Sequence, residues 1–166
     1  MSIVESFTRM QTAYAGDERR PLLGYLASLC SYGALVGIAT AVGRHKGTQL
    51  PERFTAGDTV LLALATHKAS RLATKSSITS VLRAPFTRYE QSAGEAEVNE
   101  TVRGHGVRHA VGELVTCPFC SGVWIAGALT AGLVLAPRAT RLIATALSAV
   151  AASDWLHLGY DAAKGQ

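Results

Sequence analysis

Two cysteines near the middle of the sequence could carry thiol chemistry. They form the tetrapeptide Cys117-Pro118-Phe119-Cys120, which directly precedes an apolar segment. A C-x-x-C pair at the start of a helix places two sulfurs close together, where the helix dipole stabilises a thiolate. Membrane thiol oxidoreductases with such a pair normally need a further cysteine pair, and the only other cysteine here is Cys30. Thiol–disulfide exchange is therefore one hypothesis for the pair.

A metal site is the second hypothesis for the same region. His109, Glu113 and Cys117 are spaced four residues apart, so on a helix they would share one face. Cys120 follows closely, and two cysteines, a histidine and a fourth ligand could bind zinc tetrahedrally. One C-x-x-C pair is a weak signal, whereas two pairs would be a strong one. Zinc at residues 105–120, redox chemistry and thiols that merely pack all remain open from the sequence, and zinc is the one cofactor that the residues suggest.

Ionisable residues inside otherwise apolar segments form a second candidate cluster. Arg71 lies about 13 residues past Asp58, and Asp154 lies about 15 past Ala139, so both would sit ~20 Å along their helices. An unpaired ionisable group in lipid costs at least ~2.5–3.5 kcal/mol at the centre of the bilayer. The sequence therefore predicts an Arg71–Asp154 pair between two helices, with His67 one turn before Arg71. A structural clamp is the main interpretation, and a proton or ion relay or independent snorkelling are the alternatives.

The elements that would position these groups follow from an unusually apolar composition. The chain has 166 residues, of which 48% are hydrophobic and 17% charged, against roughly 25% charged in a typical soluble domain. Mean hydropathy is +0.20. High hydrophobicity excludes a disordered chain, and three cysteines exclude a disulfide-rich scaffold. The length allows a single domain, and we expect its apolar residues to face lipid.

Four segments are predicted to cross a membrane as helices. The first, 21–43, has no charged residue and would be about 34 Å long as a helix, close to the ~30 Å hydrocarbon core. The second, 58–74, is at the lower length limit and requires its basic side chains to snorkel. The other two spans are 118–136 and 139–160. Residues 1–20 precede the first span and form a polar N-terminal segment.

Small residues recur at helical spacing within two of these spans. Gly33 and Gly37 form a G-x-x-x-G pair, and Gly127 and Gly132 each belong to a small-x-x-x-small pair. Such spacing lets another helix approach closely in lipid. We therefore expect these glycines to pack helices together, within the chain or against a protein partner or second copy.

The longest polar stretch, 75–117, separates the second span from the third. Its first part, 76–86, has apolar residues at helical spacing, which predicts an amphipathic helix lying on the membrane with Arg83 near the headgroups. Residues 90–106 contain several glutamates and three glycines, which favours a solvated loop.

The distribution of basic residues predicts an orientation. Nine lysines and arginines lie in the N-terminal segment, the 75–117 loop and the C-terminal segment, against five in the two connections on the other side. The positive-inside rule then places both termini and this loop in the cytoplasm. The net charge of +4 is explained by topology and anionic lipid rather than by nucleic acid, for which no motif is present.

Three stretches of the sequence resemble a known family. They are residues 65–90, 108–124 and 136–160, which include ATHKASRLATKSSITSVLRAPFTRYE and RHAVGELVTCPFCSGVW. They are similar to a bacterial family of small integral membrane proteins of unknown function, some labelled sporulation proteins in Bacillus and others common in actinobacteria. The resemblance covers roughly residues 58–160 and implies a bacterial membrane setting, with the first span as an addition outside the core. It implies no catalytic residue.

Together these observations predict an all-α, integral membrane four-helix bundle with a cytoplasmic loop between the second and third helices. The expected location is the bacterial inner (plasma) membrane. The leading functional hypothesis is a non-enzymatic module that binds a protein or lipid partner. The alternatives are a thiol redox protein using Cys117 and Cys120, and a zinc-stabilised loop at 105–120.

Overall fold

The protein is mostly helical, with one small hairpin. The computed structural model describes residues 3–16 and 20–165, and in these ranges seven helices flank two antiparallel strands. The four expected spans all coincide with helices, and the N-terminal polar segment contains a further one. In chain order the elements are α1 (Ile3–Ala15), α2 (Leu22–His45), α3 (Ala56–Thr74), α4 (Ser80–Arg83), β1 (Thr87–Gly94), β2 (Glu97–Val102), α5 (Val107–Thr116), α6 (Pro118–Leu135) and α7 (Pro137–Lys164).

Three helices of the described chain are long and apolar enough to cross a membrane. They are α2, α6 and α7, and their apolar windows are only 6%, 6% and 17% buried within the protein. The accessible surface of 11,440 Å² compares with roughly 7,900 Å² expected for a compact soluble protein of this mass. Most of the apolar helical surface is therefore uncovered by the chain itself. The shorter helix α3 carries four ionisable residues and is not among these three.

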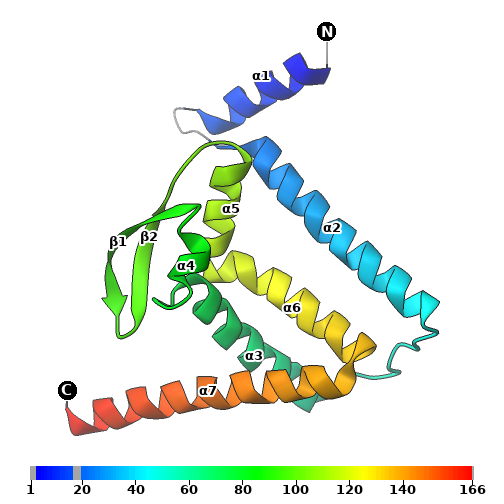
Figure 1. Cartoon of the computed structure of the whole chain (residues 1–166), viewed down its shortest axis with the longest axis vertical. Coiled ribbons are helices and arrows are strands. Elements are labelled where there is room, and N and C mark those ends of the chain that lie inside the picture. The colour runs from blue at the N-terminus through cyan, green and yellow to red at the C-terminus, as the bar shows by residue number, and fades with distance from the viewer. Residues whose placement is uncertain (1–2, 17–19, 166) are drawn as a thin grey trace.

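Helix α3 lies in the middle of the helical assembly. It packs against α6 and α7, whereas α2 packs against α5 and α6 (Figure 1). The fully buried apolar side chains are almost all alanines, such as Ala65 of α3 and Ala144 and Ala151 of α7. Ser148 of α7 also donates a hydrogen bond to the Leu61 carbonyl of α3 at 3.0 Å. Small side chains thus let α3 and α7 approach closely, as in helix pairs within lipid.

The four glycines expected to pack helices divide into two groups. A Cβ on Gly127 would lie 2.6 Å from the Tyr32 hydroxyl of α2, and one on Gly132 would lie 2.6 Å from Thr140 Oγ1 of α7. These two glycines therefore pack helices inside the chain. At Gly33 and Gly37 a Cβ would meet nothing within 4 Å, so this face of α2 is open.

A polar cap covers one end of α3 and α6. It consists of α4, the hairpin and α5, whereas the 46–55 connection and the α6–α7 turn lie at the opposite end (Figure 1). The strands pair antiparallel from Thr87 with Val102 to Gly94 with Glu97, with two irregularities in register. The expected helical character is thus confirmed, whereas the chain is not all-α and a four-helix bundle is not confirmed. The loop expected at 90–106 is largely a hairpin, in which Val98, Glu100 and Val102 lie on one face of β2.

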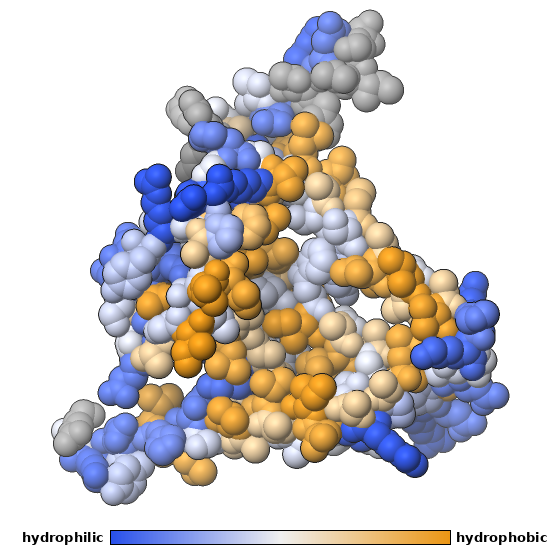
Figure 2. Space-filling view, viewed as in Figure 1, coloured by the Kyte–Doolittle hydropathy of each residue, from blue (hydrophilic) through white to orange (hydrophobic). Residues whose placement is uncertain are grey.

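The expected amphipathic helix over 76–86 is also wrong, since only Ser80–Arg83 is helical. Hydroxyl groups before it bond to nearby carbonyls instead: Ser77 Oγ donates to Ala96 O, and Thr79 Oγ1 donates to Leu72 O. Such side-chain to backbone bonds compete with helix formation. The segment nevertheless keeps an apolar surface, because Ile78, Val81 and Leu82 are all strongly exposed, and Figure 2 shows apolar atoms over α4.

Substitution of Gly24 tests the α2–α5 contact. A Cβ there would lie 2.9 Å from the Gly106 carbonyl oxygen and 2.7 Å from Ala110 Cβ. Gly24→Ala should therefore lower the free energy of unfolding by about 1–3 kcal/mol, the usual cost of overpacking. Gly33→Ala is the matched control, because the open site should gain up to about 1 kcal/mol from helix propensity. Denaturant unfolding in detergent micelles measures both, and equal effects would contradict the close α2–α5 packing.

Candidate functional site

The most enclosed polar group of the cap is Arg83, which is only 1% exposed. Its Nε and Nη2 donate to the two carboxylate oxygens of Glu100 at 2.8 and 3.0 Å. Nη1 donates to the Ala73 carbonyl at 2.8 Å and to Thr79 Oγ1 at 2.6 Å, and Nη2 donates to the Ser76 carbonyl at 3.0 Å. The expected position of Arg83 near lipid headgroups is therefore wrong. This side chain instead connects the end of α3, the start of α4 and strand β2.

A two-residue link reinforces the same junction. Arg71 Nε donates to Glu97 Oε1 at 3.0 Å, and Nη2 donates to Oε2 at 2.5 Å. The bidentate geometry is typical of strong arginine–carboxylate pairs. Glu97 begins β2, so the hairpin is held to α3 by Arg71–Glu97 and to α4 by Arg83–Glu100.

The expected Arg71–Asp154 pair is not formed. Asp154 Oδ2 instead accepts from Lys68 Nζ at 2.5 Å, and the hairpin supplies Glu97 to Arg71. Asp154 therefore meets α3 at the expected depth but pairs with Lys68, because Glu97 of the hairpin binds Arg71. His67, the third expected member, lies on the α7 side, with its ring 6.1 Å from that of Trp155.

A separate ion pair joins α3 and α7 at the opposite end. Asp58 forms a capping box with Thr55 and lies 2.6 Å from Arg141 Nη1 of α7. The Thr55 backbone N–H and hydroxyl both donate to the Asp58 carboxylate, so this arrangement stabilises the start of α3.

The C-x-x-C pair lies at the start of α6. Cys117 Sγ accepts a hydrogen bond from the Cys120 backbone N–H at 3.2 Å, so the sulfur caps the helix. Both thiols are free, with Cys117 half-buried and Cys120 exposed. Cys120 therefore offers an accessible thiol at the N-terminus of α6.

The expected zinc ligands are brought together only in pairs. Glu113 Oε1 lies 3.5 Å from His109 Nε2 and 3.6 Å from Arg20 Nη1, so it serves as a counter-ion. Cys117 and Cys120 form the other pair. Within residues 3–16 and 20–165, no group of three or more His, Cys, Asp or Glu side chains is placed to hold a metal ion.

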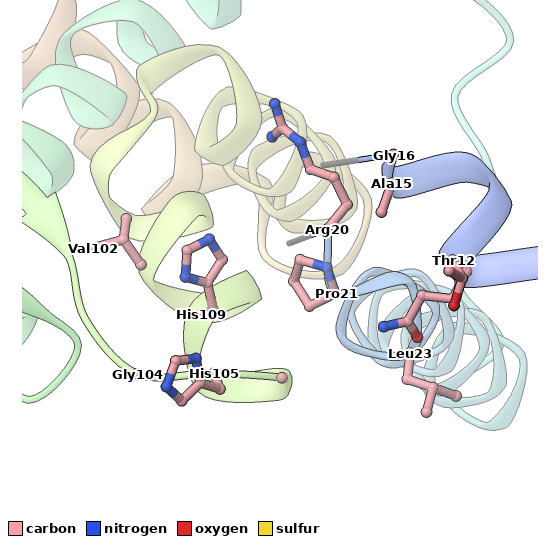
Figure 3. A pocket seen from close by; sticks show the side chains of 12 residues that line it. Thr12, Ala15, Gly16, Arg20, Pro21, Leu23, Val102, Gly104, His105 and His109 are labelled. Atoms are coloured by element: carbon pink, nitrogen blue, oxygen red, sulfur yellow. The ribbon is translucent and has the colours of Figure 1, made fainter. Parts of the chain in front are cut away.

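A pocket of about 710 Å³ lies between the end of α1, the start of α2 and the start of α5. Figure 3 shows the rings of His105 and His109 beside Arg20 and Pro21 in this pocket. Both cysteines lie outside its lining. The pocket offers hydrogen-bond donors, but Glu113 neutralises part of the charge of Arg20.

Comparison with known proteins places this arrangement in a family. Residues 61–160 match the model of the family described as "Protein of unknown function (DUF1360)". The chain belongs to this family. Sporulation protein YjcA of Bacillus subtilis (strain 168) is 38% identical over 85 residues, which cover 49% of this chain and 72% of that protein. The resemblance noted from the sequence is thereby confirmed. No solved structure gives a significant match to the chain.

The family match defines which part of the molecule is shared. It includes most of α3, the whole cap, both C-x-x-C cysteines and most of α7, and it leaves α1 and α2 outside. Sequence reasoning missed Glu97, Glu100 and Lys68 as partners of the basic residues. The available signal was Glu100 between Val98 and Val102, an acidic residue on the inward side of an alternating strand.

Removal of the Arg83 guanidinium tests its role in joining the cap to α3. Arg83→Met should lower the free energy of unfolding by about 3–5 kcal/mol, because Glu100 would remain as an unpaired buried charge. The double variant Arg83→Met/Glu100→Leu should recover much of this loss, since neither charge then remains. The exposed Arg88→Met on β1 is the control and should have little effect. Denaturant unfolding in micelles measures all three, and an equal loss for the single and double variants would contradict the pairing.

Proposed function

We propose that this chain is a non-enzymatic integral membrane module that carries a polar cap at one membrane surface and binds another membrane helix. The observation that carries the proposal is the contrast between the two parts of the molecule. The apolar windows of α2 and α6 are 6% buried, whereas the cap is organised around a fully buried arginine. An uncovered apolar helix surface of this extent is the property of a protein whose solvent is lipid.

In this proposal α3 crosses the membrane as a fourth helix with α2, α6 and α7. The charged residues of α3 are compatible with a transmembrane position, because each of them is paired with an opposite charge. Lys68 is neutralised by Asp154, Arg71 by Glu97 and Asp58 by Arg141, each within hydrogen-bonding distance. Arg71 and Asp58 also lie near opposite ends of the helix, where charged groups reach the aqueous surface.

The proposed orientation places the cap and both termini in the cytoplasm, with the helices in the plasma membrane. The excess of lysine and arginine on the cap side supports this orientation through the positive-inside rule. The exposed apolar residues Ile78, Val81 and Leu82 would then enter the headgroup region beside the helices.

The proposed partner contact is the Gly33–Gly37 face of α2. Tyr32 and Thr140 already occupy the space beside Gly127 and Gly132. The space beside Gly33 and Gly37 is empty within the chain. A close helix–helix approach in lipid requires such small residues. The partner is a membrane helix, from another protein or a second copy. Because α2 lies outside the family match, this contact would belong to a subset of the family.

Enlargement of the open face tests the proposed contact. Gly37→Leu should reduce recovery of the partner in a detergent pull-down from native membranes by about tenfold, because the added side chain prevents close helix approach. Ser31→Leu is the matched control, since Ser31 is an exposed small residue on another side of the same helix. Unchanged association for Gly37→Leu, or equal losses for both variants, would exclude this face as the binding site.

Thiol–disulfide exchange is the second candidate function, and the free thiols of Cys117 and Cys120 at the start of α6, with Cys120 exposed, favour it. Exchange proceeds by attack of a thiolate on a disulfide sulfur through a mixed disulfide. Attack by the Cys117 thiolate would form a mixed disulfide and release one partner thiolate, and Cys120 would then resolve it. Cys120→Ser should therefore trap a covalent adduct in cells, visible as a reductant-sensitive band of higher mass. Absence of this band, with Cys117→Ser as the control, would exclude the function.

A further inference from the structure

An apolar groove runs between α2 and α6 on the side away from the cap. Its volume is about 890 Å³, within the ~300–1,000 Å³ range of small-molecule sites. Val36 and Ala39 line it from α2, Ala126 and Thr130 line it from α6, and Arg44 lies at its rim. Figure 2 shows the hollow beside the apolar atoms of α2.

The groove ends at an aromatic bridge between the two helices. The ring of Tyr32 lies 5.3 Å from that of Trp124, edge to face, and its hydroxyl occupies the space that a side chain at Gly127 would fill. From Tyr32 to Gly43 the groove follows 11 residues of α2, or about 17 Å of helix. This is close to half of the ~30 Å hydrocarbon core, which is the thickness of one leaflet.

The open end of the groove is basic and lies where headgroups would lie. Arg44 is exposed at the end of α2, is followed by His45 and Lys46, and has no acidic partner among the described residues. Thr48 adds a hydroxyl to the same rim. An arginine beside an apolar channel complements an amphiphile that has an anionic head and a hydrocarbon chain.

We propose that this groove binds one anionic phospholipid, with an acyl chain between α2 and α6 and the phosphate at Arg44. The leaflet-length depth and the charged rim favour this occupant over a second copy of the chain. A second copy would have to insert a helix about 10 Å wide, and the open glycines Gly33 and Gly37 lie outside the groove lining. The site goes beyond the proposed function, because it rests on the membrane setting and not on the α2 partner.

Native mass spectrometry of the full chain tests the site. The protein, released from detergent, is offered equal amounts of phosphatidylglycerol and phosphatidylcholine with identical acyl chains. The wild type should retain one lipid and prefer phosphatidylglycerol about fivefold, the contribution expected of one basic side chain at the membrane surface. Arg44→Gln should bring the two lipids to equal retention. Arg53→Gln, an exposed arginine outside the groove on the same side, should keep the wild-type preference.

A second variant separates the acyl-chain site from the headgroup site. Thr130→Phe fills the groove and should reduce retention of both lipids at least fivefold; if it fails to fold, the Arg44 and Arg53 comparison decides alone. Equal retention of the two lipids by the wild type, or equal effects of Arg44→Gln and Arg53→Gln, would overturn the proposal. A lipid-free dimer that Thr130→Phe dissociates would assign the groove to a second copy and overturn it too. A separate experiment tests the proposed function itself: release of the chain from membranes by carbonate without detergent would contradict the membrane setting.

Discussion

The guanidinium of Arg83 has five N–H donors, and burial requires that each of them finds an acceptor. Glu100 provides two oxygens, Ala73 at the end of α3 and Ser76 just beyond it provide two carbonyls, and Thr79 provides a hydroxyl. These acceptors come from α3, from the segment around α4 and from β2, so the network can form only when all three are in place. The hairpin could not hold its position alone, since an isolated two-stranded hairpin is marginally stable in water.

The helices depend on a different constraint, which is close approach between small side chains. Ala65, Ala144 and Ala151 are fully buried, and Gly127 and Gly132 are filled by side chains of neighbouring helices. Lipid provides little hydrophobic drive for helices to associate, so van der Waals contact between close backbones must do so. The large apolar side chains point outward instead. The family match, which begins in α3 and covers the cap, α6 and α7, coincides with the part of the molecule that both constraints shape together.

Charges within these helices are paired across elements, and the pairs differ from those that linear spacing predicts. Spacing correctly indicated that α3 and α7 meet near Asp154. It could not choose between Lys68 and Arg71, which lie three residues apart on α3 and reach different neighbours. Glu97 of the hairpin lies next to the end of α3, where its carboxylate forms a bidentate pair with the planar guanidinium of Arg71. The more flexible Lys68 then pairs with Asp154.

The sequence by itself determined the apolar helices, their bounds to within a few residues, and the family, because uninterrupted apolar length and local motifs are one-dimensional properties. It also indicated which glycines could allow close packing. Only the tertiary structure decided that 87–102 forms a hairpin, that Arg83 is buried, and that no three of the expected zinc ligands come together among the described residues. Those outcomes depend on which residues, distant in sequence, lie next to a given side chain in the fold. The identity of a charged residue does not show whether its side chain faces water, lipid or a buried partner.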